Sequence, residues 1–178
     1  MGFESKGKTW GANFVAPYDH DLPGLKMRYL CESLDRRSGR LLEIGSSAGK
    51  HLRSLIELGY GFDCNGTDID RDSIRLGHKT ERAISFVVAD GHHLPYADCC
   101  FDVLLIMDYL EHVENPQQAI DETLRILSDD GMLYMFVPCE ANPLSAYALF
   151  NRLFGFNVKN PSGGTFNPSS QKRSNALD

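Results

Sequence analysis

The stretch EIGSSAGK, Glu43 to Lys50, decides the fold because it lies between an apolar strand and an amphipathic helix. Before it comes the apolar run RLLEIG, and after it Leu52, Leu55 and Ile56 share one face of a predicted helix. Small residues in such a turn let the backbone approach a ligand closely, and the free N–H groups of a helix start favour negative groups. The stretch therefore predicts a strand–turn–helix unit with a ligand at the turn.

The same alternation of apolar and amphipathic segments continues outward from this unit. Apolar runs over 40–45, 61–68, 84–89, 101–107 and 132–138 predict five strands. Helices are predicted after the first, second, fourth and fifth runs, and Asp70, Asn115 and Asn142 are the expected N-caps of the last three helices. We expect Gly131 to end the helix that begins after Asn115. Repeated strand–helix units indicate an α/β fold with a mostly parallel sheet.

Length and charge limit the possible functions. The chain has 178 residues, which is one domain at the usual ~150 residues per domain. Its formal charge of −6 has the wrong sign for a domain that holds nucleic acid by its phosphates. No apolar run approaches the ~18 residues of a membrane helix, and the start of the chain is too polar for a signal peptide. We therefore expect a cytoplasmic protein with no membrane span and no nucleic-acid partner.

The cysteines do not indicate a disulfide framework or a zinc ribbon, because the five of them show no C-x-x-C spacing. Adjacent Cys99 and Cys100 could serve redox chemistry or bind a metal with the nearby pair His92-His93. The simpler interpretation is that one of the two cysteines packs inward and the other faces solvent. No metal site is expected.

Acidic residues end three successive predicted strands, at Glu43, Asp68 and Asp90. A carboxylate at the end of the second strand accepts hydrogen bonds from the ribose hydroxyls of a nucleoside in this architecture, although Asp68 could instead only start a helix together with Asp70. Asp90 is placed to bind an adenine amino group, and Gly91 leaves room for the ring. We expect the three carboxylates to line one crevice at the carboxyl ends of the strands.

A nicotinamide dinucleotide fits the turn less well. Its fingerprint G-x-G-x-x-G would need glycine at three positions, where this chain has Gly45, Ser47 and Lys50. A nicotinamide-dependent oxidoreductase is therefore a disfavoured alternative.

Together these motifs resemble the class I S-adenosylmethionine-dependent methyltransferases of the small-molecule "methyltransferase domain 11" type. LLEIGSSAGKHL is similar to the family's E/D-x-G-x-G-x-G motif and GTDID to its G-x-D-x-S ribose motif. The most specific part runs from VVADGHHLPY through DYLEHVENP to GMLYMFVP. The resemblance covers roughly residues 38–155.

The resemblance implies a Rossmann-like, doubly wound sheet with strand order 3-2-1-4-5, extended in the family by a C-terminal antiparallel hairpin. We expect that hairpin to be missing here, because the sequence after Pro138 is short and poor in apolar runs. We expect a lead-in or lid segment over 1–37, the cofactor-binding domain over 38–156 and a disordered tail over 157–178. The exposed edge of the fifth strand implies a truncated chain, an edge covered by the tail, or a homodimer formed through that edge.

The resemblance also implies which residues hold the cofactor. The turn after the first strand would bind its methionine end, with serine in place of the family's middle glycine. The end of the second strand would bind the ribose and pack on the adenine, and the end of the third would hydrogen-bond the adenine. The residues after the fourth strand would flank the sulfonium and the acceptor. In chain order the implied residues are Glu43, Gly45, Ser47 and Gly49; Asp68, Ile69, Asp90 and Gly91; and Asp108 and Tyr109.

The implied reaction is an in-line transfer of the methyl group from S-adenosylmethionine to a small-molecule acceptor, leaving S-adenosylhomocysteine. His112 is the side chain best suited to act as a general base, unless it only packs or hydrogen-bonds near the helix that follows. Tyr18 and His20 are further candidates for acceptor contacts. A non-catalytic S-adenosylmethionine-binding or interaction module is the alternative function.

Overall fold

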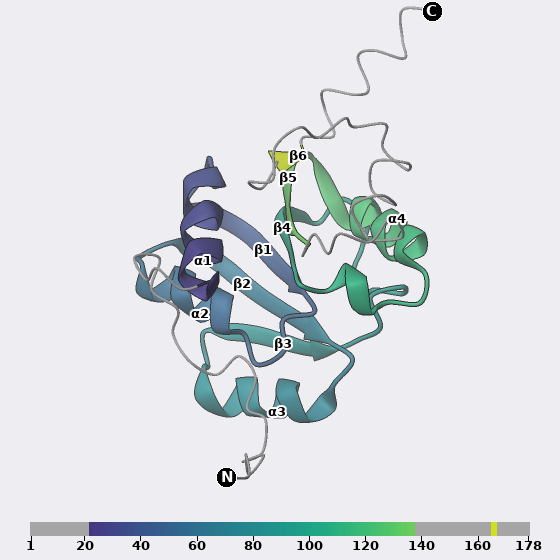
Figure 1. Ribbon diagram of the computed structural model, residues 1–178, viewed down its shortest axis with the longest axis horizontal. Coiled ribbons are helices and arrows are strands. Elements are labelled where there is room, and N and C mark those ends of the chain that lie inside the picture. Colours follow the sequence, from purple (N-terminus) through teal and green to yellow (C-terminus); the bar gives the residue numbers. More distant parts are fainter. Residues whose placement is uncertain (1–21, 138–164, 167–178) are drawn as a thin grey trace, which may run out of the picture.

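One sheet organises the molecule, and its strands run in the order β3-β2-β1-β4-β5-β6 (Figure 1). The computed structural model describes residues 22–137 and 165–166. Strands β1 to β5 are mutually parallel, whereas β6 pairs with β5 in the antiparallel sense. The five parallel strands and their order confirm the predicted Rossmann-like fold. The strands are β1 (Ser38–Ile44), β2 (Gly61–Asp68), β3 (Ile84–Val88), β4 (Phe101–Met107), β5 (Leu127–Phe136) and β6 (Thr165–Phe166).

Helices cover both faces of the sheet, which makes it doubly wound (Figure 1). The helices are α1 (Leu22–Ser33), α2 (Lys50–Glu57), α3 (Arg71–Thr80), the short 3-10 helix η1 (Leu110–His112) and α4 (Pro116–Ile126). Helices α1, α2 and α3 contribute to one apolar core, and η1 and α4 contribute to the other. Successive residues of a strand point to opposite faces, so Leu104 lies in one core and Leu105 in the other. This two-sided burial explains why β4 reads as a continuous apolar run.

Side-chain caps begin α3 and α4 as their sequences predicted. The side chain of Asp70 accepts a hydrogen bond from the backbone N–H of Asp72 at 3.1 Å. Asn115 accepts one from the backbone N–H of Gln118 at 3.2 Å, and Pro116 occupies the first helical position. Each cap satisfies a backbone donor that has no partner inside its helix.

The start of β5 differs from the prediction. Helix α4 ends at Ile126 and the strand begins at once with Leu127, so Gly131 lies within the strand and does not end the helix. The register with β4 shifts between Leu127 and Met132, which leaves the intervening residues as an outward bulge. Glycine is needed there because a Cβ on Gly131 would lie 2.5 Å from the Leu127 side chain.

Strand β6 comes from the segment 157–178, which was expected to be largely loop or disordered, and its two residues pair with the edge of β5. Phe166 lies opposite Leu133, and Thr165 lies opposite Tyr134. β-Branched and aromatic residues favour strands, and the edge of β5 offers backbone groups that need partners. The predicted helix after Asn142 and the rest of the expected hairpin region lie outside the described residues. The homodimer through this edge stays a prediction, which light scattering of the purified chain would test.

No helix in the described ranges, 22–137 and 165–166, is long and apolar enough to span a bilayer.

Candidate functional site

A cavity of about 530 Å³ opens at the carboxyl ends of β1 to β4. Of the predicted site residues, Gly45, Asp68 and Ile69 line it from the ends of β1 and β2. Asp90, Gly91, Asp108, Tyr109 and His112 line it from the segments after β3 and β4. Ligands bind at this edge of open α/β sheets, where the strand order reverses between β1 and β4.

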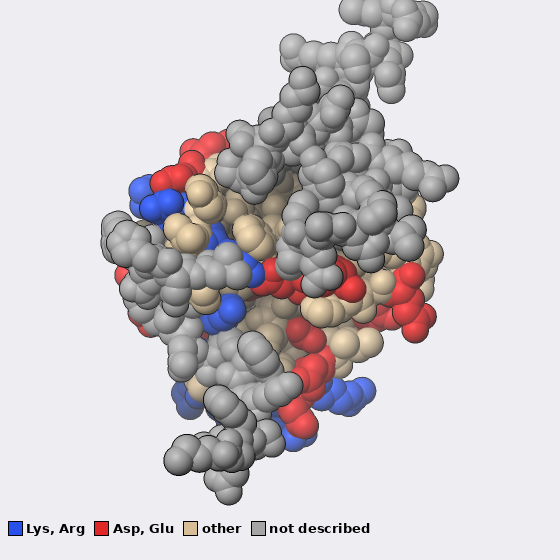
Figure 2. Space-filling model, in the orientation of Figure 1, with Lys and Arg blue, Asp and Glu red and all other residues tan. Residues whose placement is uncertain are grey.

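The described lining of this cavity is acidic. It contains four carboxylates, those of Asp68, Asp90, Asp108 and Glu114, and no Lys or Arg among the described residues that line it. Figure 2 shows acidic side chains gathered on the face where, in Figure 1, β1, β2 and β3 end. Carboxylates that share a cavity create a field that attracts cationic ligands and repels phosphates.

The turn after β1 is held by backbone hydrogen bonds from its N–H groups. The N–H groups of Gly45 and Ser46 both donate to the carbonyl of Thr67 at 2.9 Å. Ser47 has a φ of 51°, in the left-handed region, and its N–H donates to Oδ2 of Asp68 at 2.8 Å. Ser47 thus contacts the end of β2 and does not itself line the cavity. Its backbone orients the carboxylate predicted to bind a ribose.

Gly49 also serves packing and not the cavity wall. Its φ is 78°, it is the N-cap of α2, and a Cβ there would lie 2.6 Å from the Phe86 ring. Any other residue would therefore combine backbone strain with a clash against β3. The predicted contact between Gly49 and a cofactor has no support from its position.

Both oxygens of Asp68 already accept backbone hydrogen bonds, from Ser47 and, at 2.9 Å, from Asp70. The N-cap of α3 is Asp70, so Asp68 is not needed to start that helix. Each carboxylate oxygen has a second lone pair, which can accept a hydrogen bond from a ligand. The adjacent Ile69 is 72% exposed and offers an apolar surface beside the carboxylate.

Glu43 does not line the cavity, contrary to the expectation that three carboxylates share it. Its side chain is 1% exposed, and Oε1 lies 2.6 Å from Nδ1 of His51 in α2. Because alternate residues of a strand face the same side, Glu43 points with Leu41 into the core under α2, away from Leu42 on the opposite face. The second Glu43 oxygen and Nε2 of His51 are buried without a hydrogen-bond partner in the described structure.

An ion pair reaches the cavity from α1. The ammonium of Lys26 pairs with Oδ2 of Asp108 and lies 4.5 Å from the centroid of the Phe136 ring. Asp108 has a φ of 52°, and its backbone N–H donates to the Phe136 carbonyl at 3.0 Å. Sequence reasoning missed Lys26 because it lies 82 positions from its partner and belongs to no local motif. Strained backbone of this kind concentrates at functional sites.

The Tyr109 side chain lies against Gly45 and Gly91, two glycines that line the cavity. A Cβ on Gly45 would come within 2.7 Å of its ring, and a Cβ on Gly91 within 2.0 Å of its hydroxyl. Burial, together with the nearby charges of Asp90 and Asp68, raises the pKa of the Tyr109 hydroxyl to about 12. The phenol is therefore neutral at physiological pH and can donate a hydrogen bond.

His112 lines the cavity with a side chain that is 75% exposed. Its Nε2 lies 3.8 Å from the nearest carboxylate oxygen of Glu111, so no close partner in the described structure occupies it. The large exposed fraction leaves the side chain free to meet a ligand, and the role of His112 as a general base stays a prediction. Tyr18 and His20, the other candidates for acceptor contacts, lie outside the described residues.

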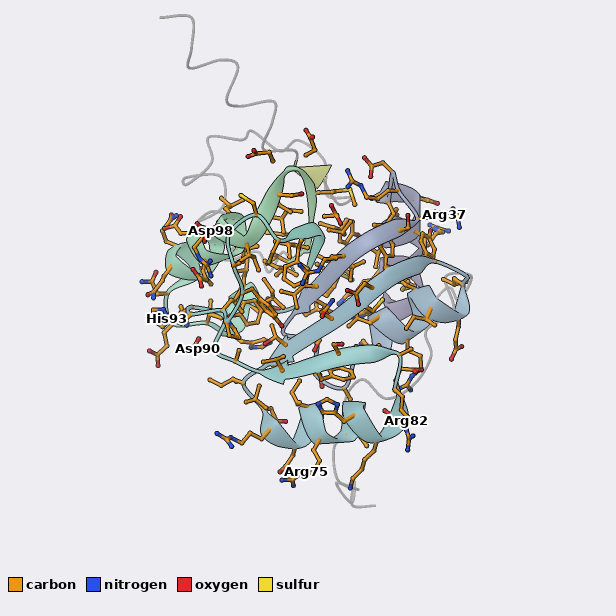
Figure 3. The ribbon with its side chains drawn as sticks, turned by 180° about the vertical axis from the view of Figure 1, so that it is seen from behind. Arg37, Arg75, Arg82, Asp90, His93 and Asp98 are labelled. Atoms are coloured by element: carbon orange, nitrogen blue, oxygen red, sulfur yellow. The ribbon has the colours of Figure 1, made fainter. Side chains whose placement is uncertain are left out.

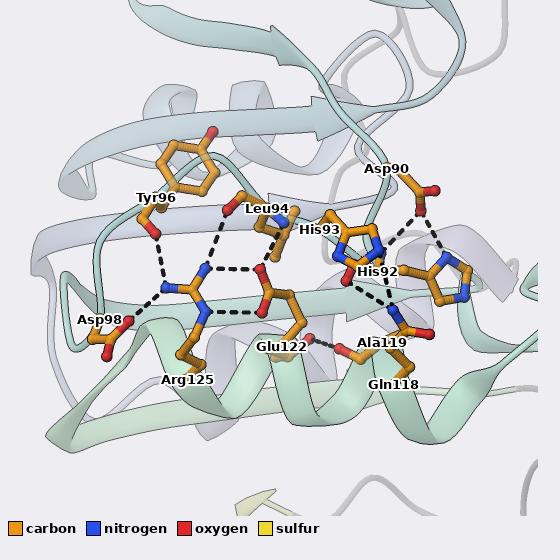
Figure 4. A network of polar contacts seen from close by, with 11 residues as sticks. Asp90, His92, His93, Leu94, Tyr96, Asp98, Gln118, Ala119, Glu122 and Arg125 are labelled. Atoms are coloured by element: carbon orange, nitrogen blue, oxygen red, sulfur yellow. Dashed lines mark hydrogen bonds and ion pairs between the residues drawn. The ribbon is translucent and has the colours of Figure 1, made fainter.

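The loop after β3 is tied to α4 by an ionic network (Figure 4). The carboxylate of Glu122 accepts the Leu94 N–H at 2.7 Å and two bonds from Arg125, whose guanidinium also donates to the carbonyls of Leu94 and Tyr96. Asp98 accepts a further bond from Arg125 at 2.6 Å. Seen from behind, Asp90 and His93 lie together in this same loop (Figure 3). The network fixes the segment that carries Asp90.

The described cysteines fit the simpler of their two interpretations. Cys99 is exposed, and Cys100 is partly buried against the core that includes α4. Within the described part of the chain, no group of three His, Cys, Asp or Glu side chains is arranged to hold a metal ion.

The family model described as "Methyltransferase domain" matches residues 42–135, more than half of the chain. The protein therefore belongs to the methyltransferase domain family. The fold and motifs are those of the class I S-adenosylmethionine-dependent methyltransferases, as the sequence predicted.

Two curated relatives illustrate the similarity. Methyltransferase GfsG of Streptomyces halstedii is 32% identical over 111 residues, which are 58% of this chain and 40% of that protein. The ubiquinone/menaquinone biosynthesis C-methyltransferase UbiE of Roseobacter denitrificans is 30% identical over 130 residues, 69% of this chain and 51% of that protein. The chain thus spans about half or less of the length of these relatives.

A solved structure agrees in fold. A protein of Methanococcus maripaludis, proposed to be an S-adenosyl-L-methionine-dependent methyltransferase, superposes with a TM-score of 0.60 at 20% identity. The superposition covers 86% of this chain and 74% of that chain.

Proposed function

We propose that the protein binds S-adenosylmethionine in the cavity at the ends of β1 to β4 and transfers its methyl group to a small-molecule acceptor. The observation that carries this proposal is the acidic cavity, which presents Asp68 and Asp90 and has no Lys or Arg among its described lining residues. S-Adenosylmethionine carries a sulfonium and an ammonium against one carboxylate, so its net charge is positive and complements this lining.

A dinucleotide fits the same cavity less well. Its pyrophosphate would bring negative charge against Asp68, Asp90 and Asp108 with no described cation in the lining to offset it. Lys26 is close, but Asp108 already neutralises its ammonium. The charge of the cavity therefore supports a cationic nucleoside over a nicotinamide dinucleotide.

The residues at the ends of β2 and β3 fit an adenosine. Asp68 offers acceptor capacity for the two ribose hydroxyls, and Ile69 offers an apolar face for the adenine ring. Asp90 offers an oxygen to the exocyclic amine, and the absence of a side chain at Gly91 leaves the space that the Tyr109 hydroxyl occupies beside it.

When bound, S-adenosylmethionine supplies an electrophilic methyl carbon on a positively charged sulfur. The role of the protein is then to hold the nucleoside and the acceptor in line, because positioning supplies much of the acceleration of such a displacement. Asp108 and Tyr109, at the end of β4, wall the cavity opposite the ends of β2 and β3. His112, exposed and facing the cavity, would accept a proton at Nε2 from an acceptor that must lose one.

Calorimetric titration tests the proposal. We expect saturable binding of S-adenosylhomocysteine and no binding of the reduced nicotinamide dinucleotide. With S-adenosylmethionine and a library of small-molecule acceptors, release of S-adenosylhomocysteine should follow for at least one acceptor class. Binding without turnover would support the alternative, a non-catalytic S-adenosylmethionine-binding module. If the chain binds neither S-adenosylmethionine nor S-adenosylhomocysteine, the proposal is overturned.

A further inference from the structure

We propose that His92 is a positioning residue that orients the Asp90 carboxylate and thereby makes the site select a purine with an exocyclic amine over one with a carbonyl at that position. The inference deepens the proposed function and rests on it.

His92 makes two hydrogen bonds to one oxygen of Asp90 (Figure 4). The His92 backbone N–H donates to Oδ1 of Asp90 at 2.9 Å, and ring atom Nδ1 lies 2.7 Å from the same oxygen. A carboxylate can only accept, so Nδ1 carries the hydrogen. Both side chains line the cavity, with 49% of Asp90 and 18% of His92 exposed.

Two donors on one oxygen fix the plane of the carboxylate and leave the other oxygen for a ligand. Among the described residues, none is seen to donate a hydrogen bond to Oδ2 of Asp90. The two bonds from His92 lower the pKa of the Asp90 carboxyl, which therefore stays ionised and acts only as an acceptor. An ionised acceptor attracts an amine hydrogen and repels a carbonyl oxygen, which is the physical basis of the selection.

The backbone of His92 is held in place from α4. Gln118 donates from Nε2 to the His92 carbonyl at 3.4 Å, and the His93 N–H donates to the Asp90 carbonyl at 2.9 Å. Nε2 of His92 is buried and has no hydrogen-bond partner in the described structure. The turn from Asp90 to His93 is thus closed on itself and attached to α4, which fixes the backbone from which the His92 ring reaches Asp90.

The neighbouring histidine provides a matched control. His93 contacts Gln118 through its ring at 3.3 Å, and that ring is not seen to donate a hydrogen bond to Asp90, on which it acts only as a weaker coulombic neighbour. Removing the imidazole at position 93 changes the same loop without removing a donor to the carboxylate. The variants to compare are His92→Ala, His92→Asn and His93→Ala, and asparagine at 92 keeps a side-chain N–H donor near the position of Nδ1.

The test measures dissociation constants for S-adenosylhomocysteine and for S-inosylhomocysteine, which has a carbonyl in place of the amine. The unaltered chain should prefer S-adenosylhomocysteine. His92→Ala should weaken that ligand by about tenfold and reduce the preference by the same factor. His92→Asn should restore most of the preference, and His93→Ala should leave it unchanged. Thermal unfolding of each variant would show that its fold is intact.

The outcomes separate this inference from the proposed function. Equal weakening of both ligands by His92→Ala, or no recovery with His92→Asn, would show a merely structural role and overturn the inference alone. If the unaltered chain binds neither ligand, the proposed function fails, and the inference fails with it.

Discussion

Lys26 of α1 and Asp108 at the end of β4 form an ion pair that attaches the N-terminal helix of the described structure to the wall of the cavity. The Lys26 side chain is 11% exposed and that of Asp108 30%, so the pair is shielded from solvent more than most surface pairs. The ammonium also lies over the Phe136 ring, which adds a cation–π contact from β5. Helix α1, the end of β4 and strand β5 thus meet at the Lys26 ammonium, beside the wall of the cavity.

We expect Lys26→Met to lower the free energy of unfolding by ~1–3 kcal/mol, because it leaves a partly buried carboxylate without its counter-charge. Urea unfolding followed by circular dichroism measures this. Arg75→Met is the control: Arg75 is 69% exposed and pairs with Asp72 at 3.2 Å within one helix, so its loss should change stability by less than ~0.5 kcal/mol. If both substitutions lower the free energy of unfolding by the same amount, the Lys26–Asp108 pair contributes no more to stability than an exposed surface pair.

Gly91→Ala should weaken binding of S-adenosylhomocysteine at least ~10-fold, because a methyl group there must displace Tyr109 into the cavity. Gly91→Ala combined with Tyr109→Ala should recover part of the affinity. Gly59→Ala is the control, since Gly59 has a φ of 82° and no atom within 4 Å of the added carbon. That variant should cost ~1 kcal/mol of stability through backbone strain and leave the affinity unchanged. Calorimetry gives the affinities, and no weakening by Gly91→Ala would contradict the prediction.

Acid should release the contact between Glu122 and Arg125. Hydrogen bonds from Arg125 are the main cause that holds the pKa of the Glu122 carboxyl below its ordinary value of 4.5. A lowered pKa in the folded state means that this contribution to stability is complete above pH 4.5 and is lost as the pH falls from there through the folded pKa. Glu122→Gln should therefore be less stable at neutral pH but lose less stability on acidification. Urea unfolding at about pH 7 and about pH 3 checks this, with exposed Glu57→Gln as the control expected to follow the unaltered chain.

His112→Gln should lower the turnover number at least ~100-fold for an acceptor that must lose a proton, and leave the affinity for S-adenosylhomocysteine within a factor of two or so. The reason is that the exposed imidazole faces the cavity without holding any described wall residue in place through its side chain. Single-turnover rates with the best acceptor of the library measure the effect. An unchanged rate would show that His112 is not the base.

Local sequence patterns predicted those parts of the structure that depend on neighbours in the chain. Apolar periodicity gave the parallel strands, and the caps Asp70 and Asn115 gave two helix starts. Because glycine often ends helices, Gly131 was expected to end the helix after Asn115, whereas in the structure it is required by the close approach of the Leu127 side chain. That contact exists only once the strand is formed.

The sequence predicted the site residues that lie at the end of a strand. It did not predict which side chains within a strand face the core and not the cavity. Asp68 and Asp90 line the cavity because Asp68 is the last residue of β2 and Asp90 follows the end of β3, both at the ligand-binding edge. Glu43 lies within β1, so the alternation of the strand turns it into the core toward His51. Lys26 depends on how α1 lies against the sheet, which no short motif encodes.

Strand β4 has hydrogen-bonded neighbours on both sides and apolar cores on both faces. Asp108 and Tyr109 follow directly after this strand, so their backbone is firmly held. Ile69 and Glu114, in contrast, project from exposed positions on the rim. Libraries meant to change the acceptor of the proposed methyl transfer should therefore leave the wall at 108–109 and the adenine surface at Ile69 untouched and vary Glu114, where altered size and charge cost little folding energy.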